Sequence, residues 1–413
     1  MTKRGLDKSL VAAALCLAAT GLAVLYSAGQ TDVPTLAARL WERQLAFLGL
    51  GVVGTIVMFR FSPRLLEWAT PFLYWGAMAL LLITLLVGTG AGTAAGARSW
   101  ISLGGLRLGQ PSEFAKIATI LMLAAHLGGK REPPNTLWGL LPACAIVALP
   151  FVLVGLQPDL GSAIVFIGVL FGMLFWVGVN PWLLLLLASP LISLMLAFST
   201  VSWGIWIIVL TALLLWLRPY AVEGIVTWLA NVGMGMMALS LWNRLAPYQQ
   251  NRLLSFLNPE IDPRATGWHI IQSKVAIGSG GLFGKGFTEG TQKRLAFIPE
   301  QATDFVYSVV GEEFGYVGVL VTLVLFGWLI TALIRVSRRA TDPFGCMAVF
   351  GIATMFFIHV LENVGMTIGL MPITGIPLPF YSYGGSFLLT SCVALGIALR
   401  VAWDSRLAGY AEL

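Results

Sequence analysis

The sequence has few charged side chains for its length. Only 11% of its 413 residues are Asp, Glu, Lys or Arg, and 58% are hydrophobic, whereas a soluble domain carries about 25% charged residues. The mean hydropathy is +0.85. These values exclude an ordinary soluble globular protein and indicate a chain that resides in lipid.

Histidine and cysteine are also scarce. His126 and His359 each stand alone in an apolar run, where polar packing is expected rather than metal binding. The net charge of +6 comes from dispersed basic residues and is therefore no nucleic-acid signal. The cysteines lie in apolar runs at spacings that match no metal site, which predicts buried packing for Cys16, Cys144, Cys346 and Cys392.

Uncharged runs long enough to cross a bilayer, which takes about 20 residues, recur along the chain. The first run, 9–29, has 21 uncharged residues. It exceeds the apolar core of a signal peptide, about 7–15 residues, and we interpret it as a retained helix. The uncharged block 160–217 accommodates three crossings if it is divided at Asn180-Pro181 and near Ser199. The pattern predicts an all-α polytopic membrane protein with about twelve transmembrane helices, at 9–29, 44–59, 68–89, 111–129, 136–156, 160–178, 181–199, 203–217, 222–243, 305–334, 344–364 and 382–401.

Basic side chains orient these spans. The short outer loops hold only Arg39, Arg43, Arg98 and Arg107 if the N-terminus is cytoplasmic. The cytoplasmic side then receives Arg60, Arg64, Lys130, Arg131, Arg218, Arg335, Arg338, Arg339, Arg400 and Arg406. This bias agrees with the positive-inside rule and places segment 244–304 outside the cytoplasm.

Segment 244–304 is an unusually long connection between membrane helices, which indicates either function or disorder. Its apolar stretches HIIQSKVAIG and RLAFIPE argue against disorder, and its seven basic against five acidic residues suit an anionic partner. Pro259 and Pro263 flank Asp262 and would hold its carboxylate in one position. A simple turn is the alternative, and on the dipeptide alone the more frequent one. The glycines of GSGGLFGKG permit either close approach to a ligand or tight turns.

Charges inside the predicted membrane helices cost about 2.5–3.5 kcal/mol each on insertion scales. In QPSEFAK, Pro111 suits the first turn of a helix, and Glu113 and Lys116 lie three residues apart on one face. They form either a neutralising structural pair or a contact for an anionic headgroup. Helix capping or an equally structural role is the simpler interpretation for the acids near other span ends, Asp159, Glu312, Glu313 and Glu362.

Six ordered segments together resemble the SEDS family (shape, elongation, division and sporulation), typified by RodA and FtsW. They are GARSWISLGG (96–105), QPSEFAK (110–116), QPDLGSA (157–163), NPEIDPRATGWHIIQSKVAIGSGGLFGKGF (258–287), IPEQATDFVYSVVGEEFGYVG (298–318) and IPLPFYSYGGS (376–386). Their length and order make the resemblance specific, and GTQKRLAF (290–297) is closer to the RodA branch.

The resemblance implies a multi-pass peptidoglycan glycosyltransferase of the bacterial cytoplasmic (inner) membrane. It would polymerise lipid II on the extracytoplasmic face for cell elongation and rod shape, beside a class B penicillin-binding protein and the elongation machinery. Asp262 matches the family's essential loop aspartate, and Glu113 and Lys116 match its intramembrane charged pair.

Three departures from the family pattern stand out. The family normally has ten spans, so residues 203–243 are predicted to be an inserted helix pair within one membrane domain, 1–413, whose catalytic loop is 244–304. Ala302 stands where the family usually has His. Gly109 looks inserted before QPSE, which could shift the entry of that helix.

The implied reaction joins a sugar hydroxyl to an anomeric carbon and expels polyprenyl pyrophosphate. A positioned carboxylate that accepts the hydroxyl proton is worth about 10²–10⁴-fold, which makes Asp262 the candidate catalytic base. Asp262 could equally hold a divalent cation, Mg or Mn, or serve in both roles. The candidate substrate-binding residues are Arg98, Glu113, Lys116, Arg252, Lys274 and Lys285. Competing hypotheses are a lipid II flippase, a scaffold of the elongation machinery and an FtsW-type division polymerase.

The twelve-span topology predicts the accessibility of single cysteines introduced after removal of the native ones. A cysteine at Ala265 should react with a membrane-impermeant thiol reagent in intact cells, because its loop is extracytoplasmic, whereas cysteines at Ala221 and Ala408 should not. Labelling at Ala221 would contradict the count of twelve spans, and protection at Ala265 would contradict the extracytoplasmic loop.

Overall fold

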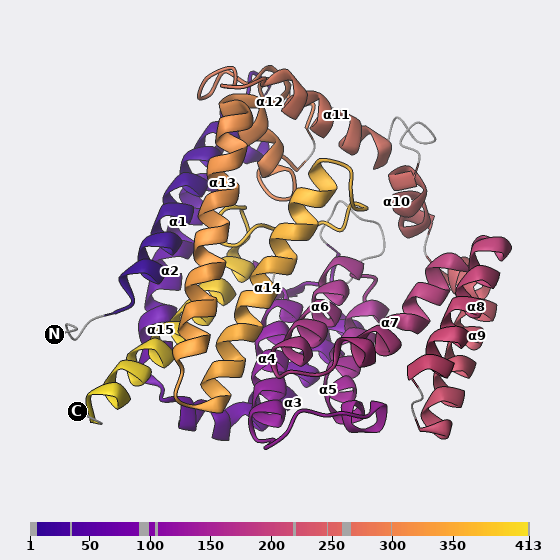
Figure 1. Ribbon diagram of the computed structural model, residues 1–413. Coiled ribbons are helices and arrows are strands. Elements are labelled where there is room, and N and C mark those ends of the chain that lie inside the picture. The colour runs from indigo at the N-terminus through magenta and orange to yellow at the C-terminus, as the bar shows by residue number, and fades with distance from the viewer. Residues whose placement is uncertain are drawn as a thin grey trace.

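The protein is almost entirely helical in its structure, a computed structural model (Figure 1). The structure describes residues 6–33, 35–90, 99–103, 106–217, 220–245, 247–257, 266–298 and 300–411. The α-helices are α1 (Lys8–Ala28), α2 (Leu40–Arg60), α3 (Pro63–Val87), α4 (Pro111–Gly128), α5 (Leu137–Leu156), α6 (Leu160–Trp176), α7 (Pro181–Leu196), α8 (Thr200–Leu217), α9 (Ala221–Arg244), α10 (Pro247–Leu257), α11 (Thr266–Ser279), α12 (Thr291–Arg294), α13 (Val306–Arg339), α14 (Pro343–Thr367) and α15 (Gly385–Ala411). A short 3-10 helix, Leu36–Arg39, precedes α2.

Every predicted membrane span coincides with a helix, α1 to α9 and α13 to α15. Within the described ranges, nine of these helices are long and apolar enough to cross a membrane, and α6 and α7 are shorter apolar helices. The remaining one, α4, carries Glu113 and Lys116. The protein is therefore a multi-pass helical membrane protein, and its total of twelve crossings stays a prediction.

Short polar residues and prolines set several helix boundaries as the sequence predicted. Asn180 caps α7 through the N–H of Trp182, and Pro181 occupies the first turn of this helix. Asp159 likewise caps α6 by accepting from the N–H of Ser162. The division of the uncharged block at Asn180-Pro181 and the capping role of Asp159 are both confirmed.

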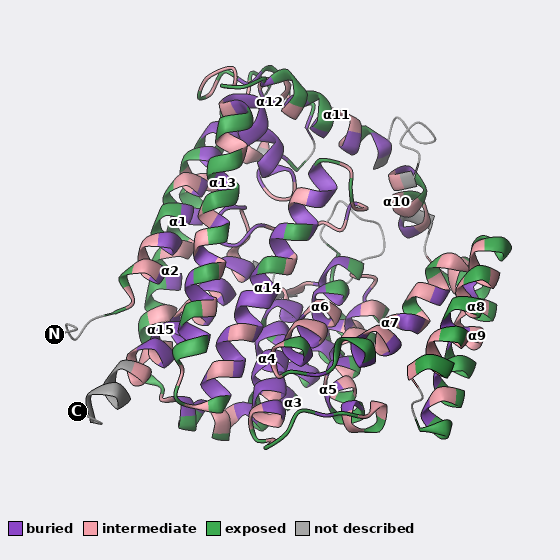
Figure 2. Ribbon diagram, in the orientation of Figure 1, coloured by how far each residue is buried: buried purple, intermediate pink, exposed green. Residues whose placement is uncertain are grey.

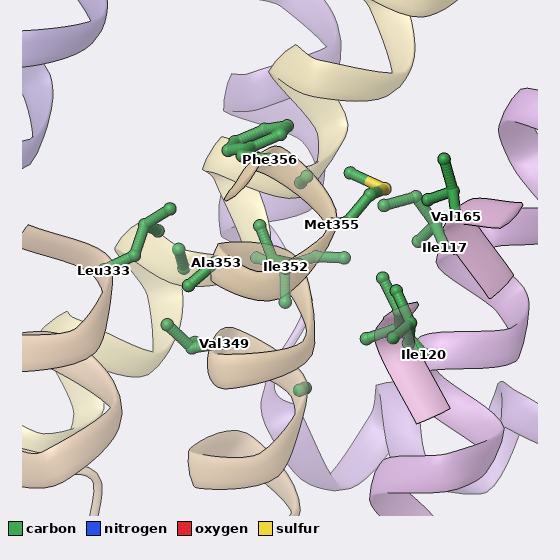
Figure 3. Packing of buried hydrophobic residues seen from close by; sticks show 14 of the residues in the cluster. Ile117, Ile120, Val165, Leu333, Val349, Ile352, Ala353, Met355 and Phe356 are labelled. Atoms are coloured by element: carbon green, nitrogen blue, oxygen red, sulfur yellow. The ribbon is translucent and has the colours of Figure 1, made fainter. Parts of the chain in front are cut away.

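The core is organised around α14, which packs against α4, α6, α13 and α15. Figure 3 shows Ile352 of α14 facing Ile117 and Ile120 of α4, whereas Ala353 faces Leu333 of α13. All five side chains are less than one tenth exposed. Figure 2 shows α14 largely buried and α8 and α9 largely exposed. Helix α14 is therefore the central helix of the bundle.

Helices α8 and α9 lie at the edge of the bundle and reach it through α7 (Figure 1). Asn231 of α9 donates to Ser189 Oγ (2.8 Å), and its carbonyl accepts from Ser193 Oγ (2.7 Å), both on α7. Two α8 indoles add to the network, because Trp203 donates to Ser193 (2.8 Å) and Trp206 to Asn231 Oδ1 (3.2 Å). Such hydrogen bonds hold apolar helices together where lipid provides no hydrophobic drive.

Two strands in the connection from α3 to α4 were not predicted. β1 (Ile101–Leu103) and β2 (Leu106–Gly109) pair antiparallel, with a register shift between Ile101 and Ser102. Leu103 pairs with Leu106 and Ile101 with Gly109, so β2 contains one extra residue. A bulge of this kind absorbs an inserted residue, and α4 still begins at Pro111 as predicted.

The cysteine prediction was partly wrong. Cys392 is buried, but Cys16 is exposed on α1, and the other two are intermediate. The reason is that an apolar run in a membrane helix also supplies the outward face of the bundle, so apolar surroundings in the sequence do not imply burial in the fold.

Segment 244–304 contains three helices, α10 to α12, and α11 packs against α13 and α14. In Figure 1 this segment covers the ends of α13 and α14 that lie away from the chain termini. Asp262, the candidate catalytic residue, lies outside the described residues. The described helices of the segment lie on either side of it in the sequence, α10 before it and α11 and α12 after it.

α13 is interrupted at Gly315, whose φ of 62° and ψ of −158° are conformations that essentially only glycine adopts. In an unbroken helix the N–H groups of Tyr316 and Val317 would donate to carbonyls four residues earlier. Here they donate instead to Gly281 O (2.9 Å) and Leu282 O (3.1 Å) of the loop.

The carbonyls that the interruption releases are satisfied by the same piece of chain. Glu312 O accepts from the N–H of Lys285 (3.0 Å), and Glu313 O accepts from the N–H of Gly286 (3.0 Å). Residues 281–286, the splice segment, thus bridge both sides of the break. Two glycines of GSGGLFGKG allow close backbone packing here, since a Cβ on Gly280 or Gly284 would collide with the carbonyl of Gly311 or Glu313.

Replacement of Gly315 by alanine should destabilise the protein. The positive φ costs about 1–3 kcal/mol for other residues, and the added Cβ would meet the backbone of Gly284 and Leu282. Gly327→Ala is the matched control, because it lies in the same helix with no atom near its Cβ. Thermal unfolding in detergent should show a lower Tm for Gly315→Ala and an equal or higher Tm for Gly327→Ala. Equal Tm values for both variants would show that the break is not a structural requirement.

Candidate active site

The first turns of α4 place two opposite charges inside the protein. Lys116 Nζ lies 2.8 Å from Glu113 Oε2, and the two side chains are 0% and 3% exposed. Removing either charge from water costs several kcal/mol unless a partner compensates it. The helical spacing predicted this neighbourhood, and the structure shows the two groups as an ion pair.

His359 of α14 is a third member of this group. Its Nε2 lies 2.9 Å from Lys116 Nζ, and its Nδ1 lies 3.0 Å from the carbonyl of Pro377. An ammonium only donates and a carbonyl only accepts, so Nε2 is the acceptor and Nδ1 carries the proton of a neutral imidazole. The ring also stacks on Phe387 of α15, 4.3 Å between centroids. We call Glu113, Lys116 and His359 the intramembrane cluster.

Two more acids border the intramembrane cluster. Asp159, at the start of α6, accepts a 2.8 Å hydrogen bond from Gln110 Nε2, directly before α4. Glu362 lies one turn after His359 on α14 and is buried. Polar contacts of the cluster thus join α4 to α14, ring stacking of His359 adds α15, and the bond from Gln110 to Asp159 adds α6. Its first effect is to fix the relative positions of these four elements.

A second charged group lies on the loop side, outside the membrane helices. Asp304 precedes α13, and burial together with Glu300 raises its pKa to about 7, while Arg252 of α10 opposes the shift. Burial and the same Arg252 lower the pKa of His269 on α11. Arg252 therefore acts on groups from both neighbouring elements. Sequence reasoning named Arg252 but missed Asp304, although it lies in the TDF motif of 303–305.

Lys285 and Lys293 form ion pairs with two adjacent glutamates in the first part of α13, before the break at Gly315. Lys285 Nζ lies 2.8 Å from Glu312 Oε1, and Lys293 Nζ lies 2.8 Å from Glu313 Oε1. The hydroxyl of Ser27 on α1 also donates to Glu313 (2.6 Å), so this pair links α1, the loop and α13. Three of the four side chains are 0% exposed, and Lys285 is 26% exposed. Both glutamates are thus ion-pair partners, and Glu312 also accepts from N–H groups of α12.

The predicted site residues are distributed over several places. Glu113 and Lys116 come together, whereas Arg252 lies on α10 and Lys285 in the splice segment. Lys274 is exposed on α11, and its side chain lies against the backbone of Gly369, just beyond α14. Asp262 and Arg98 lie outside the described residues. No group of three metal-ligating side chains occurs in the part of the chain that the structure describes.

Comparisons with known proteins place this architecture among cell-wall synthases. The model of the FtsW/RodA/SpoVE cell cycle proteins matches residues 7–407. The chain is 34% identical to the peptidoglycan glycosyltransferase RodA of Treponema pallidum, over 96% of this chain and 97% of that one. It is 35% identical to a probable peptidoglycan glycosyltransferase FtsW of Trichlorobacter lovleyi, over 97% and 94%.

A solved structure gives the same likeness in three dimensions. A chain from a peptidoglycan synthase complex, studied for the coordination of polymerization and crosslinking, is similar with a TM-score of 0.70 and 30% identity. The likeness covers 97% of this chain and 98% of that chain.

The ion pair of α4 predicts non-additive mutational effects. Glu113→Gln or Lys116→Met alone leaves a buried charge uncompensated, which costs about 3–5 kcal/mol, whereas the double variant leaves none. Thermal unfolding should therefore give a lower Tm for each single variant than for the double variant. The exposed pair of Asp32 and Arg294 (3.0 Å) is the control, since such pairs couple by only about 0–1 kcal/mol. Additive losses at Glu113 and Lys116 would show that their charges do not interact.

Proposed function

Because the chain belongs to the FtsW/RodA/SpoVE family of cell cycle proteins, we propose that it is a peptidoglycan glycosyltransferase. It polymerises lipid II into glycan strands and releases polyprenyl pyrophosphate. The observation that carries the proposal is the match over nearly the whole chain with relatives named for this activity, combined with the loop helices α11 and α12, which cover one end of a membrane helix bundle.

In this proposal Asp262 is the catalytic base. Its carboxylate accepts the proton of the attacking sugar hydroxyl while the bond from the anomeric carbon to the pyrophosphate breaks. The residues on either side of it, Arg252 on α10 and Thr266 at the start of α11, belong to helices that pack against one another and, through α11, against the bundle. A base must be held at a fixed distance from a lipid-linked sugar, and this packing supports such a role by holding the helices that precede and follow Asp262.

The pyrophosphate that leaves must be neutralised. Lys274, which is exposed on α11, is better suited to this than Lys285, because Glu312 already neutralises Lys285 at 2.8 Å. A divalent cation held by Asp262 would supply the same neutralisation. Lys116 is buried inside the bundle between Glu113 and His359, and we assign it to holding the helices beneath the reacting groups rather than to proton transfer.

The basic residues of the connecting loops support a placement in the bacterial cytoplasmic membrane with the loop on the extracytoplasmic face. A class B penicillin-binding protein is the proposed partner, since the similar solved chain comes from a complex that couples polymerization to crosslinking. The RodA-like GTQKRLAF segment favours a role in elongation. Relatives named RodA and FtsW match at 34% and 35% identity, so division is the alternative role.

Asp262→Asn tests the proposed reaction most simply. The substitution keeps the size of the side chain but removes the base, so glycan polymer from labelled lipid II should fall by about 10²-fold or more with the purified protein. Asp32→Asn, the same change at a 51% exposed acid on the loop side, should retain normal synthesis.

The same assay separates the competing functions. Translocation of labelled lipid II across vesicles without polymer would favour a flippase, and neither polymer nor translocation would favour a scaffold. Near-normal polymer from Asp262→Asn would remove this carboxylate from the mechanism.

A further inference from the structure

The splice segment carries two large apolar side chains that no other part of the protein covers in the described structure. Phe283 is 80% exposed and Leu282 is 64% exposed, although both lie within a short turn between Gly281 and Gly284. Burial of a side chain of this size would contribute about 1.5–3 kcal/mol. Leu282 and Phe283 are the most exposed large apolar side chains among the described residues of segment 244–304, and two such side chains next to each other indicate a contact with something outside the chain.

Hydrogen bonds fix the backbone of the turn that holds Leu282 and Phe283. Leu282 accepts through its carbonyl from the N–H of Val317, and Gly284 donates to Gly280 O (2.8 Å). The next residue, Lys285, is held by the ion pair with Glu312. The backbone on both sides of Phe283 is thus fixed to α13, and this holds the Phe283 side chain at the surface.

The position of the turn along α13 sets its depth in the membrane. Basic residues mark the far end of this helix, beginning at Arg335. At 1.5 Å per residue, Tyr316 lies about 29 Å from Arg335, close to the roughly 30 Å of a bilayer hydrocarbon core. The carbonyls of Gly281 and Leu282 are bonded directly to Tyr316 and Val317. Leu282 and Phe283 therefore lie at the boundary between hydrocarbon and headgroups on the loop side.

The neighbouring surface has the composition of such a boundary. Phe287 stacks on Tyr26 at the end of α1 (6.3 Å), and Tyr26 packs edge-on against Trp41 at the start of α2 (5.7 Å). Aromatic belts of this kind mark membrane interfaces. Beyond the break, α13 continues with an exposed apolar face that includes Val321 (52%) and Val324 (68%). The turn is hydrogen-bonded to Tyr316 and Val317, which are themselves 57% and 44% exposed where this part of α13 begins.

We propose that the turn of residues 281–284 inserts Leu282 and Phe283 into the adjacent membrane leaflet and anchors the loop to the acyl chains of phospholipids. The anchor fixes the height of segment 244–304 above the bilayer, and this conclusion stands independently of the reaction that the loop carries out. Lipid is favoured over a protein partner because the turn is bonded to the exposed apolar part of α13 and lies at the depth of the interface.

The test uses nitroxide spin labels on single cysteines in the full-length protein, after replacement of its native cysteines, in nanodiscs of phosphatidylethanolamine and phosphatidylglycerol. Labels are placed at Phe283, at Val324 as a lipid-facing reference and at Glu289, a 60% exposed residue of the same loop, as a water-facing reference. Collision with oxygen, which concentrates in lipid, should exceed collision with a water-soluble nickel chelate at Phe283 and Val324. Glu289 should show the reverse.

Two outcomes would overturn the proposal. A label at Phe283 that collides with nickel as often as the label at Glu289 would place the turn in water. A label at Phe283 that is shielded from both reagents would show that a second protein surface, such as another copy of this chain, covers it. Leu282→Cys provides an independent second reading, and because both side chains are exposed, neither label disturbs the core.

Discussion

A membrane helix that breaks must find partners for the backbone groups that the break releases, because hydrocarbon offers none. α13 breaks at Gly315, and residues 281–286 provide both the acceptors and the donors that the helix has lost. One glycine conformation therefore ties an extramembrane loop to a membrane helix through four backbone hydrogen bonds. The order of the rest of the loop depends on this junction, since α11 and α12 flank the splice segment on either side.

Buried ion pairs also hold the loop against α13 and the helices of the bundle against one another. Glu312 and Glu313 lie directly before the break, and each is neutralised by a lysine of the loop. Deeper in the bundle, Lys116 connects Glu113 on its own helix to His359 on α14. Buried ions are costly unless they are paired, so each of these groups penalises arrangements in which loop and helices separate. The resulting platform is rigid on both sides of the segment that holds Asp262.

Local signals predicted much of this fold. The apolar runs predicted α1 to α9 and α13 to α15, Asn180 and Asp159 mark helix starts as expected, and the three-residue spacing of Glu113 and Lys116 places them in contact. Each of these features depends on residues that are close in the sequence, where helical geometry determines distance.

Contacts between distant segments could not be derived in this way. His359 looked isolated because its partner Lys116 lies 243 residues away, and Lys285 looked available because the approach of Glu312 depends on the break at Gly315. The same break gives the glycines of GSGGLFGKG a packing role that their spacing alone left open. Asp262 remains a prediction from its proline-flanked position and its family resemblance.

The loop and α13 form one hydrogen-bonded unit at the membrane interface. Amide hydrogen exchange of the protein in nanodiscs measures this directly at Tyr316, Val317, Lys285 and Gly286, whose N–H groups bridge the break. Slow exchange, comparable with the buried middle of α14, is the predicted result. Exchange as fast as in an unstructured peptide would show that the loop is not joined to the helix.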